Sequence, residues 1–281
     1  MDKIIAATSP KRSAKAEGES SLMRMLTVIE LFTLARPSWT VEQIAEAMGL
    51  TQSTAYRYVY TLSSFGYLSM MSGAEYCLGP KIIELDLLLR QTDPMIARAQ
   101  DLAAELIELV PEGVVSLINL RGETAISVFQ VKKPQDLDIS FERGRSMRLY
   151  AGSASKVILA HLPRSRLLKF YANNHAEIAQ FDLGQTWKEF SRALLAIRKS
   201  RSLVTVGELN PRSWGISAPV FNAEGDIRGS LNLIMPKDSH ASSDVESLSQ
   251  RLEEAARALS QGCSRLVTPP STSRDLLGDP A

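Results

Sequence analysis

The segment TQSTAYRYVYTLSSFGYL, residues 51–68, concentrates side chains that form hydrogen bonds. If it winds as a helix, at about 100° per residue, Ala55, Val59 and Leu62 fall on one side, and hydroxyl, phenol and guanidinium groups fall on the other. Groups of this kind contact the phosphates and base edges of DNA, and Arg57 is the cation among them. We therefore predict a DNA-binding face made of Thr51, Gln52, Ser53, Thr54, Tyr56, Arg57, Tyr60 and Ser64.

A second pattern whose residues could carry out a reaction is Ser153-Ala-Ser-Lys156. This S-x-x-K spacing carries the serine nucleophile of penicillin-recognising enzymes. The sequence contains neither of the partner motifs, Ser-Asp-Asn and Lys-Thr-Gly. We therefore expect no enzymatic activity, with Ser153 capping a helix and Lys156 facing solvent. A serine hydrolase that uses Ser153 and Lys156 stays open as the alternative from another class.

The histidines and cysteines indicate no metal site and no cofactor. His161, His175 and His240 have no acidic partners at the spacing of a metal site or a catalytic triad. Cys77 and Cys263 are far apart and read as thiols in a reducing compartment. The apolar runs are shorter than a membrane span, and no secretory leader is recognisable. We expect a cytoplasmic protein without a membrane partner.

The elements that must position the polar face form a helix-turn-helix pattern. Thr40 and Gln43 fit a capping box, which starts a short helix that Gly49 can end. Thr51 can then cap the polar helix, so only a tight turn separates the two helices. In such a motif the second helix enters the major groove of DNA. Residues 66–79, GYLSMMSGAEYCLG, predict two strands around a Ser-Gly turn, which would make the domain a winged helix.

The predicted DNA-binding domain lacks the usual excess of positive charge. Residues 1–80 contain seven Lys and Arg residues and seven Asp and Glu residues, and the whole chain of 281 residues has a formal net charge of +1. DNA-binding domains are usually basic. We therefore expect hydroxyl groups, backbone N–H groups and Arg57 to supply most phosphate contacts, supplemented by Lys11 and Arg12.

The second half of the chain mixes strands and helices, and the total length fits two domains. Runs rich in β-branched residues predict strands at 113–121, 124–132, 137–143, 202–209, 215–222 and 229–236. Helical patterns fall at 153–162, 165–172, 186–200 and 244–264. We predict an α+β protein with this order: a disordered arm over 1–20, a winged helix-turn-helix over 21–79, a linker helix over 80–93, a second domain over 94–266 and a disordered tail over 267–281.

These features together resemble the IclR family of bacterial transcription regulators, over about residues 20–265. The runs that carry the resemblance are TVEQIAEAMGLTQSTAYRYVYTL, YCLGPKIIELD, GRSMRLYAGSASKVILAHLP and GELNPRSWGISAPVFNAEGDIRGSLNLIMP. The resemblance implies a linker helix and a GAF-like effector domain with a central antiparallel sheet. It also implies a homodimer or homotetramer that binds a palindromic DNA operator.

The same resemblance implies where an effector would bind. The family commonly has Asp and Cys in its pocket and serines on the last strand; Val206 and Gly215 replace the first two, and Asn232 and Ile234 replace the serines. Backbone N–H groups at a helix start near Ser153 would bind a carboxylate. We expect the pocket to be lined by Tyr150, Ala151, Ser153, Ala154, Val206, Trp214, Gly215, Ser217, Asn232 and Ile234. Compared with the common pattern of the family, this pocket lining has more apolar and aromatic surface. The expected effector is therefore an aromatic or similarly bulky organic acid, with a catabolic operon as target.

A third class of protein, a GAF-like sensor without DNA binding, would keep the second domain. It would have no need for a helix with five polar side chains on one face. The sequence leaves open whether a DNA-binding regulator represses or activates, and whether it is a dimer or a tetramer.

Overall fold

The computed structural model describes residues 20–132, 142–239 and 244–262. The expected arm over 1–20, except Ser20, and the expected tail over 267–281 lie outside the described residues. So do Lys11, Arg12, His240, Cys263 and most of the strand expected at 137–143. The chain divides between Asp93 and Pro94 into two compact units, each of which is described by itself.

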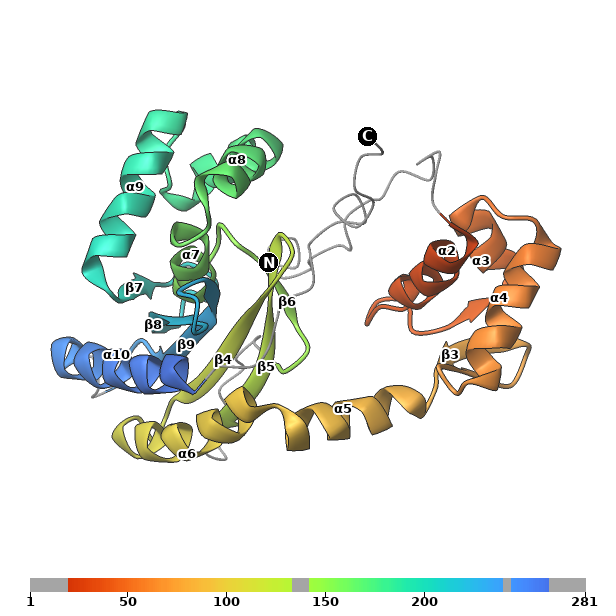
Figure 1. The fold of residues 1–281 in the computed structure, drawn as a ribbon, viewed down its shortest axis with the longest axis horizontal. Coiled ribbons are helices and arrows are strands. Elements are labelled where there is room, and N and C mark those ends of the chain that lie inside the picture. Colours follow the sequence, from red (N-terminus) through yellow and green to blue (C-terminus); the bar gives the residue numbers. More distant parts are fainter. Residues whose placement is uncertain (1–19, 133–141, 240–243, 263–281) are drawn as a thin grey trace. The chain divides into compact units, whose positions relative to one another are not determined.

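The first unit packs short helices on a small sheet (Figure 1). Its elements are α2 (Ser21–Thr27), the 3-10 helix η1 (Val28–Leu31), β1 (Trp39–Thr40), α3 (Val41–Met48), α4 (Gln52–Ser64), β2 (Leu68–Met70), β3 (Glu75–Leu78) and α5 (Lys81–Thr92). Val28, Ile44, Ala55 and Val59 are fully buried at the centre of its core. Tyr58 joins this core, and its hydroxyl forms a hydrogen bond of 2.9 Å with Ser21 Oγ. The buried side of α4 is therefore the apolar side expected from its sequence.

The wing is the antiparallel pair β2 and β3, in register from Leu68 opposite Leu78 to Met70 opposite Tyr76. Its turn passes through Gly73, with φ of 83°, a backbone conformation that costs glycine little. A strand that the sequence did not predict, β1, pairs with β3 and completes a three-stranded sheet. Two residues are too few to show an alternating pattern.

The second unit is built on one antiparallel sheet with strand order β6-β5-β4-β9-β8-β7. The strands are β4 (Val114–Arg121), β5 (Thr124–Lys132), β6 (Ser146–Arg148), β7 (Leu203–Val206), β8 (Ser213–Phe221) and β9 (Ile227–Pro236). The helices are α6 (Pro94–Leu109), α7 (Ser153–Ala160), α8 (Arg164–Ile178), the 3-10 helix η2 (Ala179–Phe181), α9 (Trp187–Ser200) and α10 (Val245–Gln261). An N-terminal helix-turn-helix followed by helices on an antiparallel sheet confirms the predicted α+β class.

Helices cover both faces of this sheet (Figure 1). α6 and α10 pack with one face into a core that includes Leu231 and Leu233. α7, α8 and α9 form the second core on the other face. Because side chains alternate along a strand, Ser230, Asn232 and Ile234 of β9 point toward the α7 side. Polar residues of the sheet thus meet the start of α7.

None of the helices in the described part of the chain combines the length and the apolarity that a membrane-spanning helix needs. The described residues also contain no group of three or more His, Cys, Asp or Glu side chains placed to hold a metal ion.

Candidate nucleic-acid interface and effector cavity

The predicted caps of the helix-turn-helix are present. Thr40 Oγ1 accepts a hydrogen bond from Gln43 N at 3.3 Å, and Gln43 Oε1 accepts one from Thr40 N at 3.1 Å, which completes the capping box. Gly49 ends α3 in the left-handed conformation, with φ of 60° and ψ of 41°. Thr51 Oγ1 then accepts from Thr54 N and caps α4. These local bonds fix the tight connection between the two helices.

The outer face of α4 presents the expected polar side chains to solvent. Tyr56 and Tyr60 are 58% and 64% exposed, and their rings stack with centroids 6.4 Å apart and an interplanar angle of 18°. Arg57 is exposed, and its guanidinium has no hydrogen-bond or ion-pair partner among the described residues. Thr51, Gln52, Ser53 and Ser64 are exposed and Thr54 is half-buried. The apolar face of α4 thus packs into the core, and its polar and aromatic face points to solvent.

Most cations of this unit already have partners within the chain. Arg36 stacks on Trp39, 3.3 Å from the ring centroid. Lys81 pairs with Glu84 at 2.8 Å, and Arg90 pairs with Asp86 at 3.1 Å. The remaining cations between residues 20 and 93 are Arg24 and Arg57. Few cations of this unit are therefore left without an internal contact, in addition to the low positive charge expected from the sequence.

In the second unit, a small cavity forms where the start of α7 meets β8 and β9. Its volume is about 40 Å³. It brings together eight of the ten residues that we expected to line an effector pocket: Ala151, Ser153, Ala154, Trp214, Gly215, Ser217, Asn232 and Ile234. These residues come from segments up to 83 positions apart, 151 to 234, and only the fold brings them to one place.

The structure places the other two expected residues elsewhere. The Tyr150 ring packs in the second core against Phe181 and Phe170, with centroid distances of 5.3 and 6.4 Å. Burial raises the pKa of the Tyr150 phenol, partly opposed by Arg148. Val206 is 59% exposed, because alternation along the edge strand β7 turns it away from the sheet face that lines the cavity. Thr205 and Gly207, its neighbours, line the cavity instead.

A polar row crosses the sheet beneath α7. The register places Ser116 and Ser217 opposite Asn232 on its two sides. Asn232 Nδ2 donates to Ser116 O and Ser230 O, both at 3.1 Å, and Ser230 Oγ lies 3.1 Å from Asn232 Oδ1 and donates to Ala154 O at 3.0 Å. Asn232 thus bonds across β4 and β9, and Ser230 joins β9 to the first turn of α7.

Sequence reasoning missed several residues that line the cavity. Three of them carry buried polar atoms that have no hydrogen-bond partner among the described residues: Ser116 Oγ, Ser155 Oγ and Glu208 Oε2. Buried polar groups are normally paired, so these atoms are available to a ligand. The signal for Ser116 was present, since it interrupts the apolar run VVSLINL of β4.

The geometry corrects our expectation for Ser153 and Lys156. Gly152 occupies the N-cap of α7, and Ser153 Oγ accepts a hydrogen bond of 2.7 Å from Ser217 Oγ. Lys156 does not face solvent: it is buried, forms an ion pair with Glu208 and donates to Phe181 O at 2.7 Å. A serine nucleophile needs a base within hydrogen-bond reach, and this lysine is bonded elsewhere.

Two family models cover the chain. The model of the IclR helix-turn-helix domain matches residues 21–69, and the model of the bacterial transcriptional regulator IclR C-terminal domain matches residues 89–261. The chain belongs to the IclR family. IclR-family members are transcription factors, so this protein is a DNA-binding transcriptional regulator with a C-terminal effector-binding domain, and it is not a serine hydrolase.

Individual relatives are similar over nearly their whole length. HTH-type transcriptional regulator KipR of Bacillus subtilis is 24% identical over 243 residues, which are 86% of this chain and 96% of KipR. An IclR transcriptional regulator from Alicyclobacillus acidocaldarius has the same fold, with a TM-score of 0.73, 20% identity and coverage of 88% and 100%. An IclR homologue from Microbacterium hydrocarbonoxydans, solved with 4-hydroxybenzoate, gives a TM-score of 0.68, 20% identity and coverage of 87% and 99%.

Proposed function

We propose that this regulator binds a palindromic operator as a homo-oligomer, with α4 of each protomer in the major groove. The observation that carries this proposal is the outer face of α4, where Arg57 and the stacked Tyr56–Tyr60 pair are exposed although large aromatic side chains usually avoid solvent. Such a face can bond to phosphates through the hydroxyls and to a guanine through Arg57.

Two features support an oligomer: the small number of unpaired cations in the DNA-binding unit and the exposed apolar side chains of α5. With few unpaired cations, one protomer gains little from phosphate contacts, so several helices must bind together. Along α5, Ile83, Leu87, Leu88 and Leu89 are between 46% and 71% exposed. We propose that a second copy covers these apolar side chains and that α5 serves as the linker helix. A two-fold dimer then matches a palindromic site.

Fluorescence anisotropy tests this proposal, on an operator that is first defined by footprinting with the full-length protein. Arg57→Ala should weaken operator binding by roughly 1–3 kcal/mol, a factor of about 5 to 150. The melting temperature should be unchanged, since the Arg57 guanidinium makes no hydrogen bond or ion pair with the described residues. Arg192→Ala, an exposed arginine on α9, is the matched control and should leave the affinity unchanged. Equal operator affinities for Arg57→Ala and the wild type would remove Arg57 from the interface.

We further propose that the effector is an aromatic or similarly bulky organic acid and that the regulated genes form a catabolic operon. We also propose that the protein acts in the cytoplasm. Gly152 offers no side-chain cap, so the first N–H groups of α7 are available to a carboxylate. Glu208 Oε2 can accept a hydrogen bond from a hydroxyl on the far side of the same ligand. The relative solved with 4-hydroxybenzoate supports this class, because that ligand carries both groups.

The cavity has to enlarge to admit such an acid. Ligand sites have volumes of roughly 300–1,000 Å³, whereas this cavity has about 40 Å³. Leu209 is the side chain that closes it over the helix start, since an added Cβ at Gly152 would come within 2.5 Å of Leu209 Cδ1. We propose that the segment carrying Leu209 moves when the effector enters.

Calorimetry tests the effector class with 4-hydroxybenzoate and benzoate beside glyoxylate and pyruvate. The aromatic acids should bind more tightly, because they bury more apolar surface, at about 25 cal/mol per Å². Leu209→Ala should strengthen binding of the aromatic acids, and Asn232→Ala should weaken it. Tight binding of the small oxoacids alone, or an Asn232→Ala variant that binds the aromatic acid as the wild type does, would overturn this assignment.

A further inference from the structure

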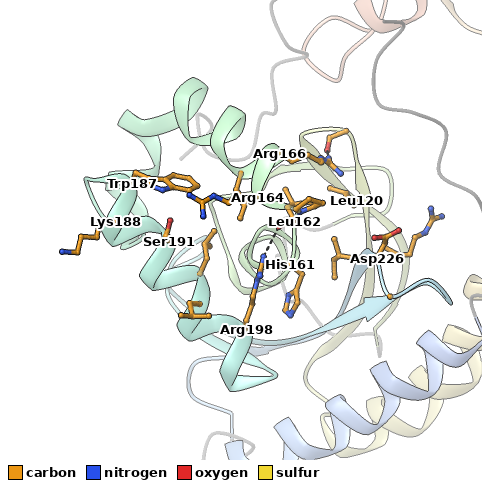
Figure 2. A pocket seen from close by; sticks show the side chains of 18 residues that line it. Leu120, His161, Leu162, Arg164, Arg166, Trp187, Lys188, Ser191, Arg198 and Asp226 are labelled. Atoms are coloured by element: carbon orange, nitrogen blue, oxygen red, sulfur yellow. Dashed lines mark hydrogen bonds between the residues drawn. The ribbon is translucent and has the colours of Figure 1, made fainter. Parts of the chain in front are cut away.

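A second and much larger cavity opens on the surface of the effector domain (Figure 2). It lies between α8, α9, the end of α7, the hairpin of β4 and β5 and the hairpin of β8 and β9. Its volume is about 920 Å³. We call it the arginine groove. It shares no lining residue with the effector cavity. Its volume lies within the range of roughly 300–1,000 Å³ that is typical of small-molecule sites.

The floor of the arginine groove is apolar and buried. It is formed by Leu162, Leu167, Leu194 and Ile227, which are all buried members of the second core. The half-buried Trp187 and the exposed Leu195 extend this surface toward solvent. Trp187 and Leu195 are therefore apolar side chains of the groove that stay in contact with water until a ligand covers them.

The walls of the arginine groove are cationic. Figure 2 shows Arg164, Arg166 and Arg198 around the same space, whereas Lys188 points away from it. Asp226 is the acidic side chain among the described residues that line the groove. The positive charge is therefore not balanced within the cavity itself.

Two of these guanidinium groups are held in place by backbone carbonyls. Arg198 donates to Leu162 O at 2.9 Å and also to Ala160 O, and Arg166 donates to Gly122 O. Arg164 has no hydrogen-bond or ion-pair partner among the described residues. A guanidinium has five N–H donors in a planar fork, so each of the three keeps donors that match a carboxylate.

We propose that the arginine groove is a binding site for an amphiphilic organic anion, a small molecule with a carboxylate head and an apolar chain or ring. The head pairs with Arg164 and with the remaining donors of Arg198 or Arg166. The apolar part covers the leucine and isoleucine floor. A protein segment would need a longer and shallower surface, whereas this cavity is concave and has the size of one ligand.

Isothermal titration calorimetry on the full-length protein tests the site, with octanoate as the probe and octan-1-ol as a probe of equal chain length and no charge. Octanoate should bind at one site per chain, at least about tenfold more tightly than the alcohol, because only the anion pairs with arginine. Arg164→Gln should weaken octanoate binding about tenfold, and Leu195→Glu should weaken it at least as much by placing a like charge in the groove. Both side chains are exposed, so melting temperatures should stay unchanged.

Two control variants show whether octanoate binds in the arginine groove rather than elsewhere on the protein. Arg192→Gln, on the same helix as Leu195 but outside the groove, should bind octanoate as the wild type does. Asn232→Ala alters the effector cavity and should leave octanoate binding unchanged. Sedimentation velocity without ligand should give the same oligomeric state for Arg164→Gln, Leu195→Glu and the wild type.

Four outcomes would overturn the proposal. They are no octanoate binding up to about 1 mM, equal affinity for octan-1-ol, loss of binding in Asn232→Ala but not in Arg164→Gln, and a changed oligomeric state in the groove variants. The last outcome would mean that a second copy of the chain covers the groove.

Discussion

The buried ion pair between Lys156 and Glu208 gives a prediction whose magnitude follows from the structure. The two side chains are 7% and 16% exposed, and Lys156 also donates to Phe181 O at 2.7 Å. Removing one partner of a buried pair leaves the other charge without compensation and costs roughly 3–5 kcal/mol. Lys156→Met should therefore lower the free energy of unfolding of the effector domain by about 3–5 kcal/mol, a large part of the roughly 5–15 kcal/mol typical of a domain.

The double variant Lys156→Met, Glu208→Gln isolates the interaction. With no charge left on either side, it should be more stable than Lys156→Met alone, and the coupling between the two positions should be at least about 2 kcal/mol. Lys169→Met, an exposed lysine on α8, is the control and should change stability by less than about 0.5 kcal/mol.

Urea denaturation followed by tryptophan fluorescence measures these changes. A Trp39→Phe background leaves two of the three tryptophans, Trp187 and Trp214, and both report on the second unit. If Lys156→Met cost less than about 1 kcal/mol, or if the two substitutions were additive, the ion pair would not be stabilising in the way described.

Three further predictions concern other parts of the chain. The logarithm of operator affinity should fall against the logarithm of salt concentration with a slope of only about −2 to −3 per protomer, and a slope steeper than about −5 would show a basic surface that we have missed. Burial lowers the pKa of His161 below the value of 6.5 of an exposed histidine, so the free energy of unfolding should fall as the pH drops through and below 6.5. In urea titrations His161→Gln should lose this part of the pH dependence, whereas His175→Gln, at an exposed position, should keep it. Gly229→Ala would place a Cβ 1.9 Å from Ile118 O, so β4 and β9 must separate locally, and thermal denaturation should show a loss of at least about 2 kcal/mol.

The sequence by itself determined the helix-turn-helix. Its caps are contacts between residues two to five positions apart, such as Thr40 with Gln43 and Thr51 with Thr54. The exposed face of α4 follows from helical periodicity, since Ala55 and Val59 had to point into a core. In the second half, five of the strands expected from β-branched runs begin and end within a few residues of β4, β5, β7, β8 and β9.

Only the tertiary structure decided what surrounds the buried polar groups. Lys156 looks like a solvent-facing lysine in the sequence, and its partner Glu208 is 52 positions away. Val206 and Tyr150 are near cavity residues along the chain, but strand alternation and core packing turn their side chains elsewhere. The bond from Asn232 to Ser116 joins residues 116 positions apart, and the arginine groove draws on five separate parts of the effector domain. Local hydrogen bonds and helical periodicity are determined by neighbouring residues, whereas burial and charge pairing depend on which distant segments the packed sheet brings together.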